Sequence, residues 1–114
     1  MLPKDNRLTQ KKDIDFVFKN GKTTKSDFLI FKFLKNHLNK TRVGFIVSKK
    51  VSNKSTKRNL IKRRLRKAVL DNFKDINSEK KQVSLDVLII TLPEILNKNF
   101  PEIKNIVSGF FKNK

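Results

Sequence analysis

Cysteine is missing from this 114-residue sequence, which excludes disulfides and thiolate metal sites and fits a reducing cytoplasm. The single histidine, His37, has no second histidine with which to hold zinc, so we expect an ordinary surface residue. No stretch approaches the roughly 18 apolar residues of a membrane helix, and the first ten residues lack the apolar core of a signal peptide. We therefore expect a soluble cytoplasmic protein with no membrane partner.

Acidic residues are scarce as well, and they are unevenly distributed. No Asp or Glu lies between Asp27 and Asp71, whereas 14 of the 28 Lys and Arg residues do, ten of them within residues 49–67. The net charge of +18 exceeds what solubility requires. A folded patch this positive repels itself unless a polyanion is near, and phosphate backbones supply one by releasing condensed counterions. The charge therefore predicts a nucleic-acid partner, although in most proteins a charge run is only a solvated face.

The remaining composition is that of one folded domain over residues 1–114. A chain of this length buries about two-thirds of its unfolded surface, and 37% hydrophobic residues with ten Phe can fill the core. These residues exclude wholesale disorder. Residues 1–8 are polar, and we expect a loose N-terminal arm. Thr9 and Gly21 are suited to begin and end a first helix, one face of which carries Ile14, Val17 and Phe18.

Three apolar segments predict strands at residues 28–34, 42–50 and 83–92, with a short additional strand at residues 22–25. In the first of the three, alternation places Phe28, Ile30 and Lys32 on one face and Leu29, Phe31 and Phe33 on the other. The continuous apolar run in residues 83–92 is typical of a strand buried on both faces.

Two further helices are expected. Ser55 or Thr56 can cap a helix over residues 57–74, whose apolar spacing predicts a buried face of Ile61, Leu65, Ala68, Val69 and Phe73. Asn99 and Glu102 form a capping box for the last helix, whose apolar face is Ile103, Ile106, Val107, Phe110 and Phe111. The order α-β-β-β-α-β-α predicts an α/β fold, a single two-layer sandwich in which the basic helix crosses over between parallel strands.

The basic helix forgoes ordinary sources of helix stability. Seven of the eleven residues 57–67 are cationic, no acid lies among these eleven residues to pair with them at i±4, and cations lie near the N-terminus, where the helix dipole disfavours them. We interpret both features as signs of an anionic ligand. The predicted patch has two helical stripes and a preceding loop: Arg58, Lys62 and Arg66; Asn59, Arg63 and Lys67; and Lys49, Lys50 and Lys54.

Residues 47–67, V-S-K-K-V-S-N-K-S-T-K-R-N-L-I-K-R-R-L-R-K, resemble the signature of the bacterial ribonuclease P protein subunit, in which V-S-K-K or V-A-K-K and a loop precede R-N-R-x-K-R-x-x-R on a helix. Five residues match that helix motif position for position: Arg58, Asn59, Lys62, Arg63 and Arg66. Leu60 departs from its second Arg, and Ser52 stands where glycine is frequent. The N-terminal N-R-L-(x)4-D-I-D-F-V-F-K-N-G is similar to the family's N-R-L-(x)4-D-F-x-x-V-F-x-x-G.

The resemblance implies a sandwich like the second domain of ribosomal protein S5, with a left-handed β-α-β crossover that departs from the usual rule. It implies the accessory protein subunit of an enzyme, the endoribonuclease that removes the 5′ leader of precursor tRNA, in which the RNA subunit cuts and binds most of the Mg²⁺. The partners would be that catalytic RNA and precursor tRNA, with no obligate protein partner and no organic cofactor.

The resemblance also assigns roles to residues. The nine residues of the predicted patch would bind RNA, and three residues would meet the single-stranded leader in a cleft: Ile14, Phe18 and Phe31. Aromatic side chains beside cations can stack unpaired bases. Core packing is the alternative role for each of the three.

The residues themselves argue against an active site in this chain. Asp13 and Asp15 are two positions apart on a helix and do not face each other, so they cannot converge as the carboxylates of a two-metal nuclease do. We therefore predict neither catalytic nor metal-binding residues. Two other classes of protein stay open on the residues alone: a ribosomal or rRNA-assembly protein, and a cationic protein that coats membranes or DNA.

Overall fold

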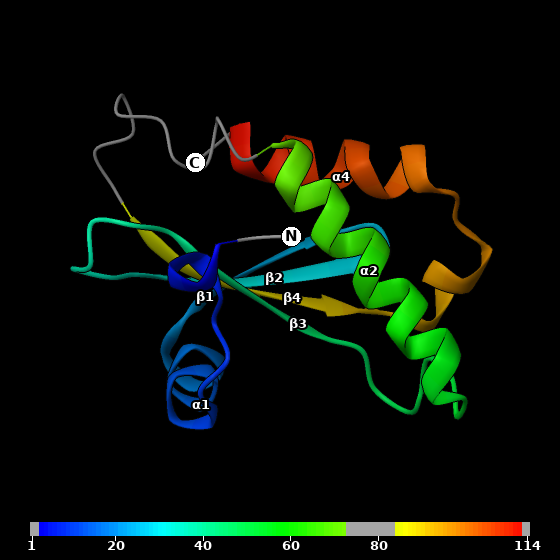
Figure 1. Cartoon of the computed structure of the whole chain (residues 1–114), viewed down its shortest axis with the longest axis horizontal. Helices are drawn as coiled ribbons and strands as arrows, with labels where there is room; N and C mark the ends of the chain where they lie inside the picture. Colours follow the sequence, from blue (N-terminus) through cyan, green and yellow to red (C-terminus); the bar gives the residue numbers. More distant parts are fainter. Residues whose placement is uncertain (1–2, 73–83, 113–114) are drawn as a thin grey trace.

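Four strands form one sheet in the order β1-β2-β4-β3 (Figure 1). The computed structural model describes residues 3–72 and 84–112. The order of helices and strands agrees with the predicted one, with two short 3₁₀ helices added. The elements are η1 (Lys4–Asn6), α1 (Lys11–Asn20), β1 (Lys22–Ser26), β2 (Leu29–Lys35), β3 (Arg42–Ile46), α2 (Ser55–Asp71), β4 (Leu85–Thr91), η2 (Pro93–Asn97) and α4 (Phe100–Lys112).

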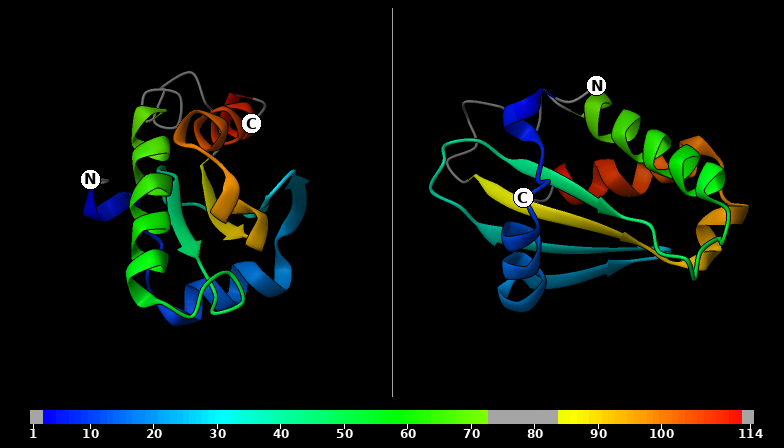
Figure 2. Two further views of the ribbon diagram at one scale, coloured as in Figure 1. Left: turned by 90° about the vertical axis from the view of Figure 1, so that its right-hand side faces the viewer. Right: turned by 60° about the horizontal axis from the view of Figure 1, so that its bottom comes forward.

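The central strand β4 is buried on both faces, as its apolar run predicts. Val87, Leu88 and Ile89 have no exposed surface. β2 pairs with β4 antiparallel and β3 pairs with it in parallel. Helices α2 and α4 cover one face of this sheet, and α1 lies on the other (Figure 2). The sheet with α2 and α4 is the predicted sandwich.

The connection from β3 through α2 to β4 is left-handed. The two strands are parallel neighbours in the sheet, so α2 carries the chain back across its face. When the sheet is turned so that α2 faces the viewer and both strands point upward, β4 lies to the left of β3. The two views in Figure 2 show this arrangement. A right-twisted sheet rarely allows this hand, and the expectation drawn from the family resemblance is confirmed.

The main core lies between the sheet and helices α2 and α4. Alternate residues of β2 point into it, and Phe31 stacks on Phe110 of α4 with ring centroids 4.2 Å apart and planes 5° apart. Leu65 and Val107 are fully buried and belong to the same cluster. Burying each of these side chains stabilises the fold by roughly 1.5–3 kcal/mol relative to leaving it exposed. The predicted apolar faces of both helices are therefore confirmed at every residue that the structure describes.

The N-terminal segment is not a loose arm over residues 3–8, and that expectation is wrong there. Leu8 is 2% exposed and shares a small core with Val17 and Leu88 on the α1 side of the sheet. Its backbone N–H donates to the carbonyl of Val43 at 3.0 Å, and the Asn6 amide donates to a backbone carbonyl of the loop before β3. The burial of Leu8 and these two hydrogen bonds together dock the segment on the edge of the sheet.

Gly44 makes that docking possible. A side chain there would place its Cβ 2.7 Å from the carbonyl oxygen of Leu8, a separation that real Cβ atoms do not reach. The N-terminal segment therefore lies against β3 at Gly44, where the strand has no side chain. Glycine here serves close backbone approach, since its φ is not positive.

The basic region differs from its prediction at two boundaries. β3 ends at Ile46, four residues earlier than predicted, and Lys49 and Lys50 lie in a turn closed by the Val51 N–H to the carbonyl of Ser48. Helix α2 begins at Ser55, two residues before Lys57, and its N-cap residue is Lys54, which makes no side-chain cap hydrogen bond. The predicted caps Ser55 and Thr56 are wrong, because both hydroxyls already lie within the helix.

The first helix is bounded as predicted to within one residue, since Gln10 rather than Thr9 precedes it and Gly21 follows it. The last helix starts as predicted, because the side-chain oxygen of Asn99 accepts the Glu102 N–H at 3.0 Å. Phe73, Lys74 and Val83, which the predictions placed in a helix and a strand, lie outside the described residues.

Candidate nucleic-acid interface

Helix α2 holds the cationic side chains in a fixed direction because its apolar side is anchored. Ile61, Leu65, Ala68 and Val69 are at most 5% exposed and pack against the sheet and α4. The side chains between them in the helical sequence must therefore face solvent or the edge strand β3. Six of the nine predicted residues lie on this helix: Arg58, Asn59, Lys62, Arg63, Arg66 and Lys67.

The two predicted stripes differ in their surroundings. Lys62 and Arg66 face β3 and line a pocket there, with Lys62 half-buried and Arg66 exposed. Asn59 and Arg63 are exposed and point away from the sheet side of the helix. Among the residues that the structure describes, only Lys67 of the nine has an acidic partner, Asp71, at 3.9 Å. The described part of the patch therefore keeps nearly all of its positive charge.

The loop before the helix is tied to it by Arg58. The guanidinium of Arg58 donates to the carbonyl oxygen of Ser52 at 2.9 Å, and the Ser52 hydroxyl accepts the backbone N–H of Lys54 at 3.2 Å. These bonds bring the exposed Lys49, Lys50 and Lys54 to the N-terminal end of α2. The structure thus joins loop and helix into one patch, as predicted, and gives Arg58 a positioning role inside it.

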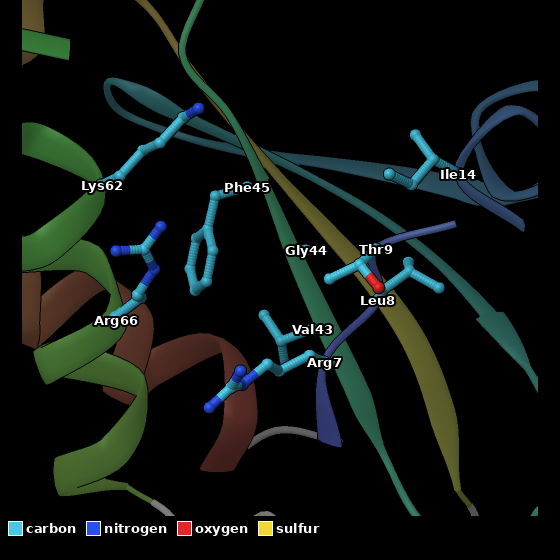
Figure 3. A pocket seen from close by; sticks show the side chains of 9 residues that line it. All are labelled: Arg7, Leu8, Thr9, Ile14, Val43, Gly44, Phe45, Lys62 and Arg66. Carbon is cyan, nitrogen blue, oxygen red and sulfur yellow. The ribbon is translucent and has the colours of Figure 1, made fainter. Parts of the chain in front are cut away.

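A pocket of about 410 Å³ opens between α2, β3 and the N-terminal segment (Figure 3). Phe45 lies between β3 and the side chains of Lys62 and Arg66, and the guanidinium of Arg7 approaches from the N-terminal segment. The pocket continues around Gly44 of β3, where its other lining residues are Leu8, Thr9, Ile14 and Val43. Sequence reasoning missed Arg7 and Phe45, because only the docking of residues 3–8 and the left-handed crossover bring them to α2.

The three predicted leader-cleft residues do not share one surface. Phe31 is wrong as a leader contact, since its side chain has no exposed surface and stacks on Phe110 in the main core. Ile14 and Phe18 lie on α1, on the opposite face of the sheet. Ile14 is half-buried and lines the pocket at Gly44, whereas Phe18 is 49% exposed.

Lys32 occupies the place beside α1 that Phe31 was expected to take. Its ammonium lies 4.6 Å from the centroid of the Phe18 ring and donates to the carbonyl oxygen of Phe18 at 3.2 Å. The predicted alternation in β2 already placed Lys32 and Phe31 on opposite faces, and the structure confirms that division. The missing information was which of these faces meets α1.

An ionic network anchors α1 to the sheet beside this surface. Arg42 donates two hydrogen bonds to Asp86 of β4, at 2.8 and 2.7 Å, and a third to Asp13 of α1 at 3.3 Å. The hydrogen bonds to Asp86 raise the pKa of Arg42 above its ordinary value, so this guanidinium is cationic at neutral pH. Sequence reasoning did not find the network because its partners are 29 and 44 residues apart.

In the part of the chain that the structure describes, side chains that could ligate a metal ion are dispersed. His37 is exposed, as predicted. Within residues 3–72 and 84–112, no three His, Cys, Asp or Glu side chains gather closely enough to hold a metal ion. None of the helices in this described portion combines the length and the hydropathy needed to cross a membrane.

The sequence was compared with those of known protein families. A sequence model described as Ribonuclease P matches residues 2–114. The chain belongs to the Ribonuclease P family. The two motifs from which the resemblance was predicted lie at the surfaces just described, one on α2 and its loop and the other on α1.

Relatives in the Ribonuclease P family extend over most of the chain. A ribonuclease P protein component of Legionella pneumophila (strain Corby) is 37% identical over 95 residues, which are 83% of this chain and 76% of that protein. Another, from Caldanaerobacter subterraneus subsp. tengcongensis, is 30% identical over 112 residues, 98% of this chain and 91% of its own length.

Solved structures of RNase P proteins have the same fold. The protein from Thermotoga maritima superposes with a TM-score of 0.79 at 24% identity, covering 95% of this chain and 96% of that one. A mutant of the Staphylococcus aureus protein with defective mRNA degradation activity gives 0.81 at 22% identity, covering 96% of this chain and 88% of that one. At this level of identity the likeness concerns the fold.

Proposed function

We propose that this chain is the protein subunit of ribonuclease P and that it binds the catalytic RNA subunit through α2 and the preceding loop. The observation that carries the proposal is a helix of the Ribonuclease P family whose buried Leu65 fixes an uncompensated cationic side toward solvent. The helix that carries these guanidinium and ammonium groups is already anchored to the core, so binding to phosphates does not require the backbone to be ordered first. The set in question is Lys49, Lys50, Lys54, Arg58, Asn59, Lys62, Arg63, Arg66 and Lys67.

The second ligand that we propose is the 5′ leader of precursor tRNA, held on the α1 side of the sheet. Phe18 exposes half of its ring beside the Lys32 ammonium, and Ile14 lies on the same helix one turn earlier. An exposed aromatic ring can stack an unpaired base, and the neighbouring cation can meet its phosphate. Phe31 has no part in this proposal, since it is inside the core.

The protein would act on binding and positioning, and the RNA subunit would cut the leader to leave the mature tRNA 5′ end. Magnesium ions, held mainly by the RNA, would activate the attacking water and stabilise the leaving oxygen. This chain's cations would bring leader and catalytic RNA together by lowering the repulsion between their phosphates. The reaction would take place in the cytoplasm, with no obligate protein partner and no organic cofactor.

Reconstitution tests the proposal. Cleavage of a precursor tRNA by the RNA subunit of the same genome is measured at low magnesium, with and without the protein. We expect the protein to accelerate cleavage and Arg63→Ala to weaken that effect. Lys22→Ala removes one exposed cation from β1, at the opposite edge of the sheet from α2, and should behave like the wild type. Cleavage that is indifferent to the protein would refute the assignment.

A further inference from the structure

Phe45 is the only aromatic ring of the described residues that lines the pocket beside α2, and its surroundings are unusual for a core residue. Val43, two residues earlier on the same face of β3, is 3% exposed, whereas Phe45 is only half-buried. The guanidinium of Arg66 lies beside the ring, while the side chains of Lys62 and Arg7 line the pocket at its two ends (Figure 3). A partly open ring among cations is a surface on which a flat, anionic ligand gains both stacking and charge contacts.

The dimensions of the pocket limit the kind of ligand. The whole pocket, from Phe45 around Gly44 to Ile14, has a volume of about 410 Å³, in the lower part of the range of small-molecule sites, roughly 300–1,000 Å³. That volume suits one nucleotide but not a duplex. The cations come from α2 and the N-terminal segment, two elements held in place by the burial of Leu65 and Leu8. Hence the site is preformed, and little ordering is needed before a ligand binds.

We propose that this pocket takes one unpaired nucleotide of the RNA partner, with the base against Phe45 and its phosphate at Lys62 and Arg66. The inference rests on the proposed function, since it names a contact within that RNA interface. The proposed base and phosphate contacts lie at the α2 end of this pocket, whereas its other end reaches Ile14 of α1. The surface proposed for the leader is centred on Phe18 and Lys32, on the α1 side of the sheet. The pocket adds recognition of a flipped-out base to a helix whose other contacts neutralise phosphates.

The affinity for the catalytic RNA subunit tests the stacking contact. Phe45→Leu keeps an apolar side chain in the core but removes the flat ring, and we expect affinity to fall by about 5- to 150-fold. The slope of affinity against salt should stay unchanged, because no charge is lost. Phe33→Leu is the matched control: it makes the same change on the same face of the sheet, in a half-buried residue that packs on Phe110 away from the pocket.

The outcomes separate this inference from the function on which it rests. If the wild-type protein binds the RNA and Phe45→Leu behaves like Phe33→Leu, the stacking site is refuted while the proposed function stands. If the wild-type protein fails to bind the RNA, both are refuted. Thermal unfolding of both variants is recorded alongside, and equal melting temperatures show that the affinity difference does not come from lost stability.

A small probe tests the pocket without the large RNA. Uridine 5′-monophosphate and ribose 5-phosphate are titrated into the full chain, and the backbone amide resonances of Val43, Gly44 and Phe45 are followed by NMR. We expect both to bind but the nucleotide to bind at least about 5-fold more tightly, an advantage that Phe45→Leu removes. Equal affinities for the two probes in the wild type would overturn the base contact and leave only a phosphate site.

Discussion

Helices α2 and α4 pack side by side on the same face of the sheet, yet they differ in the caps and charged residues at their ends. Each buries four apolar residues. Helix α4 begins after Asn99, whose side chain caps it. It has Glu102 in its first turn and Lys112 in its last, and the helix dipole favours both charges. Helix α2 begins behind an uncapped Lys54 and has no acid in its first turn and no base in its last.

The difference shows which part of each helix serves stability and which serves binding. The apolar faces are alike because both must be held to the same core. The solvent side of α4 stabilises α4 itself, whereas the solvent side of α2 presents charge at some cost to the helix. Substitutions on the two helices should therefore separate unfolding free energy from RNA affinity.

The largest effect should come from the anchored face of α2. Leu65→Ala removes a fully buried side chain, and the cavity should lower the free energy of unfolding by about 2–5 kcal/mol. Urea denaturation followed by circular dichroism measures this loss. Leu60→Ala, on the same helix at a site that is 41% exposed, should change stability by no more than about 0.5 kcal/mol. A wild-type midpoint for Leu65→Ala would mean that the helix face is assigned incorrectly.

The next effect should come from the cationic side and should appear in binding only. Arg66→Ala removes an exposed guanidinium at the pocket, and RNA affinity should fall by about 1–3 kcal/mol, with a salt slope lower by about one. Titrations at several salt concentrations measure both quantities. Lys112→Ala on α4 is the matched loss of one exposed charge and should leave affinity near that of the wild type.

Arg58→Ala is expected to act differently from Arg66→Ala although both belong to one stripe. Arg58 holds the carbonyl of Ser52, so its loss should also free the loop that carries Lys49 and Lys50. The same affinity in the variants as in the wild type, at every salt concentration, would refute the patch.

The smallest effects concern the two helix starts, and they should have opposite signs. Asn99→Ala removes the cap of α4 and should lower the free energy of unfolding by about 1 kcal/mol without altering RNA affinity. Lys54→Asn supplies the cap that α2 lacks and should raise stability by a similar amount while weakening RNA binding, because a cation is lost. Chemical denaturation and RNA titration of both variants measure the pair. Destabilisation by Lys54→Asn would show that α2 does not tolerate a cap there.

Much of this arrangement was predictable because it depends on local spacing. The intervals between Ile61, Leu65 and Val69 identify the buried side of α2, and a short capping pattern locates the start of α4. These features need only the geometry of one helix. The same reasoning placed the cations of α2 beside its apolar face, which the structure confirms for Lys62 and Arg66.

The errors arise where position depends on distant segments. Alternation separates Phe31 from Lys32, but it does not say that α1 lies on the Lys32 side, so Phe31 was assigned to the wrong surface. Leu8 lies in a polar segment with no period, and its burial follows from the glycine at position 44 of a strand that comes much later in the sequence. The N-cap of α2 is Lys54, one residue before the predicted Ser55, and residue preferences at helix ends do not locate a boundary to within one residue.

The docking of residues 7 and 8 on β3 also affects how readily the edge of the sheet could pair with a strand of a second molecule. A strand at the rim of a sheet offers unpaired amides and carbonyls to any other extended chain, and β3 is such a strand. Arg7 bridges to Val43 there, and the backbone N–H of Leu8 takes up a carbonyl that an intruding strand would need. At the opposite rim, Lys22 and Lys25 of β1 discourage self-association by charge. Both rims of the sheet are therefore poor templates for strand pairing with a second molecule.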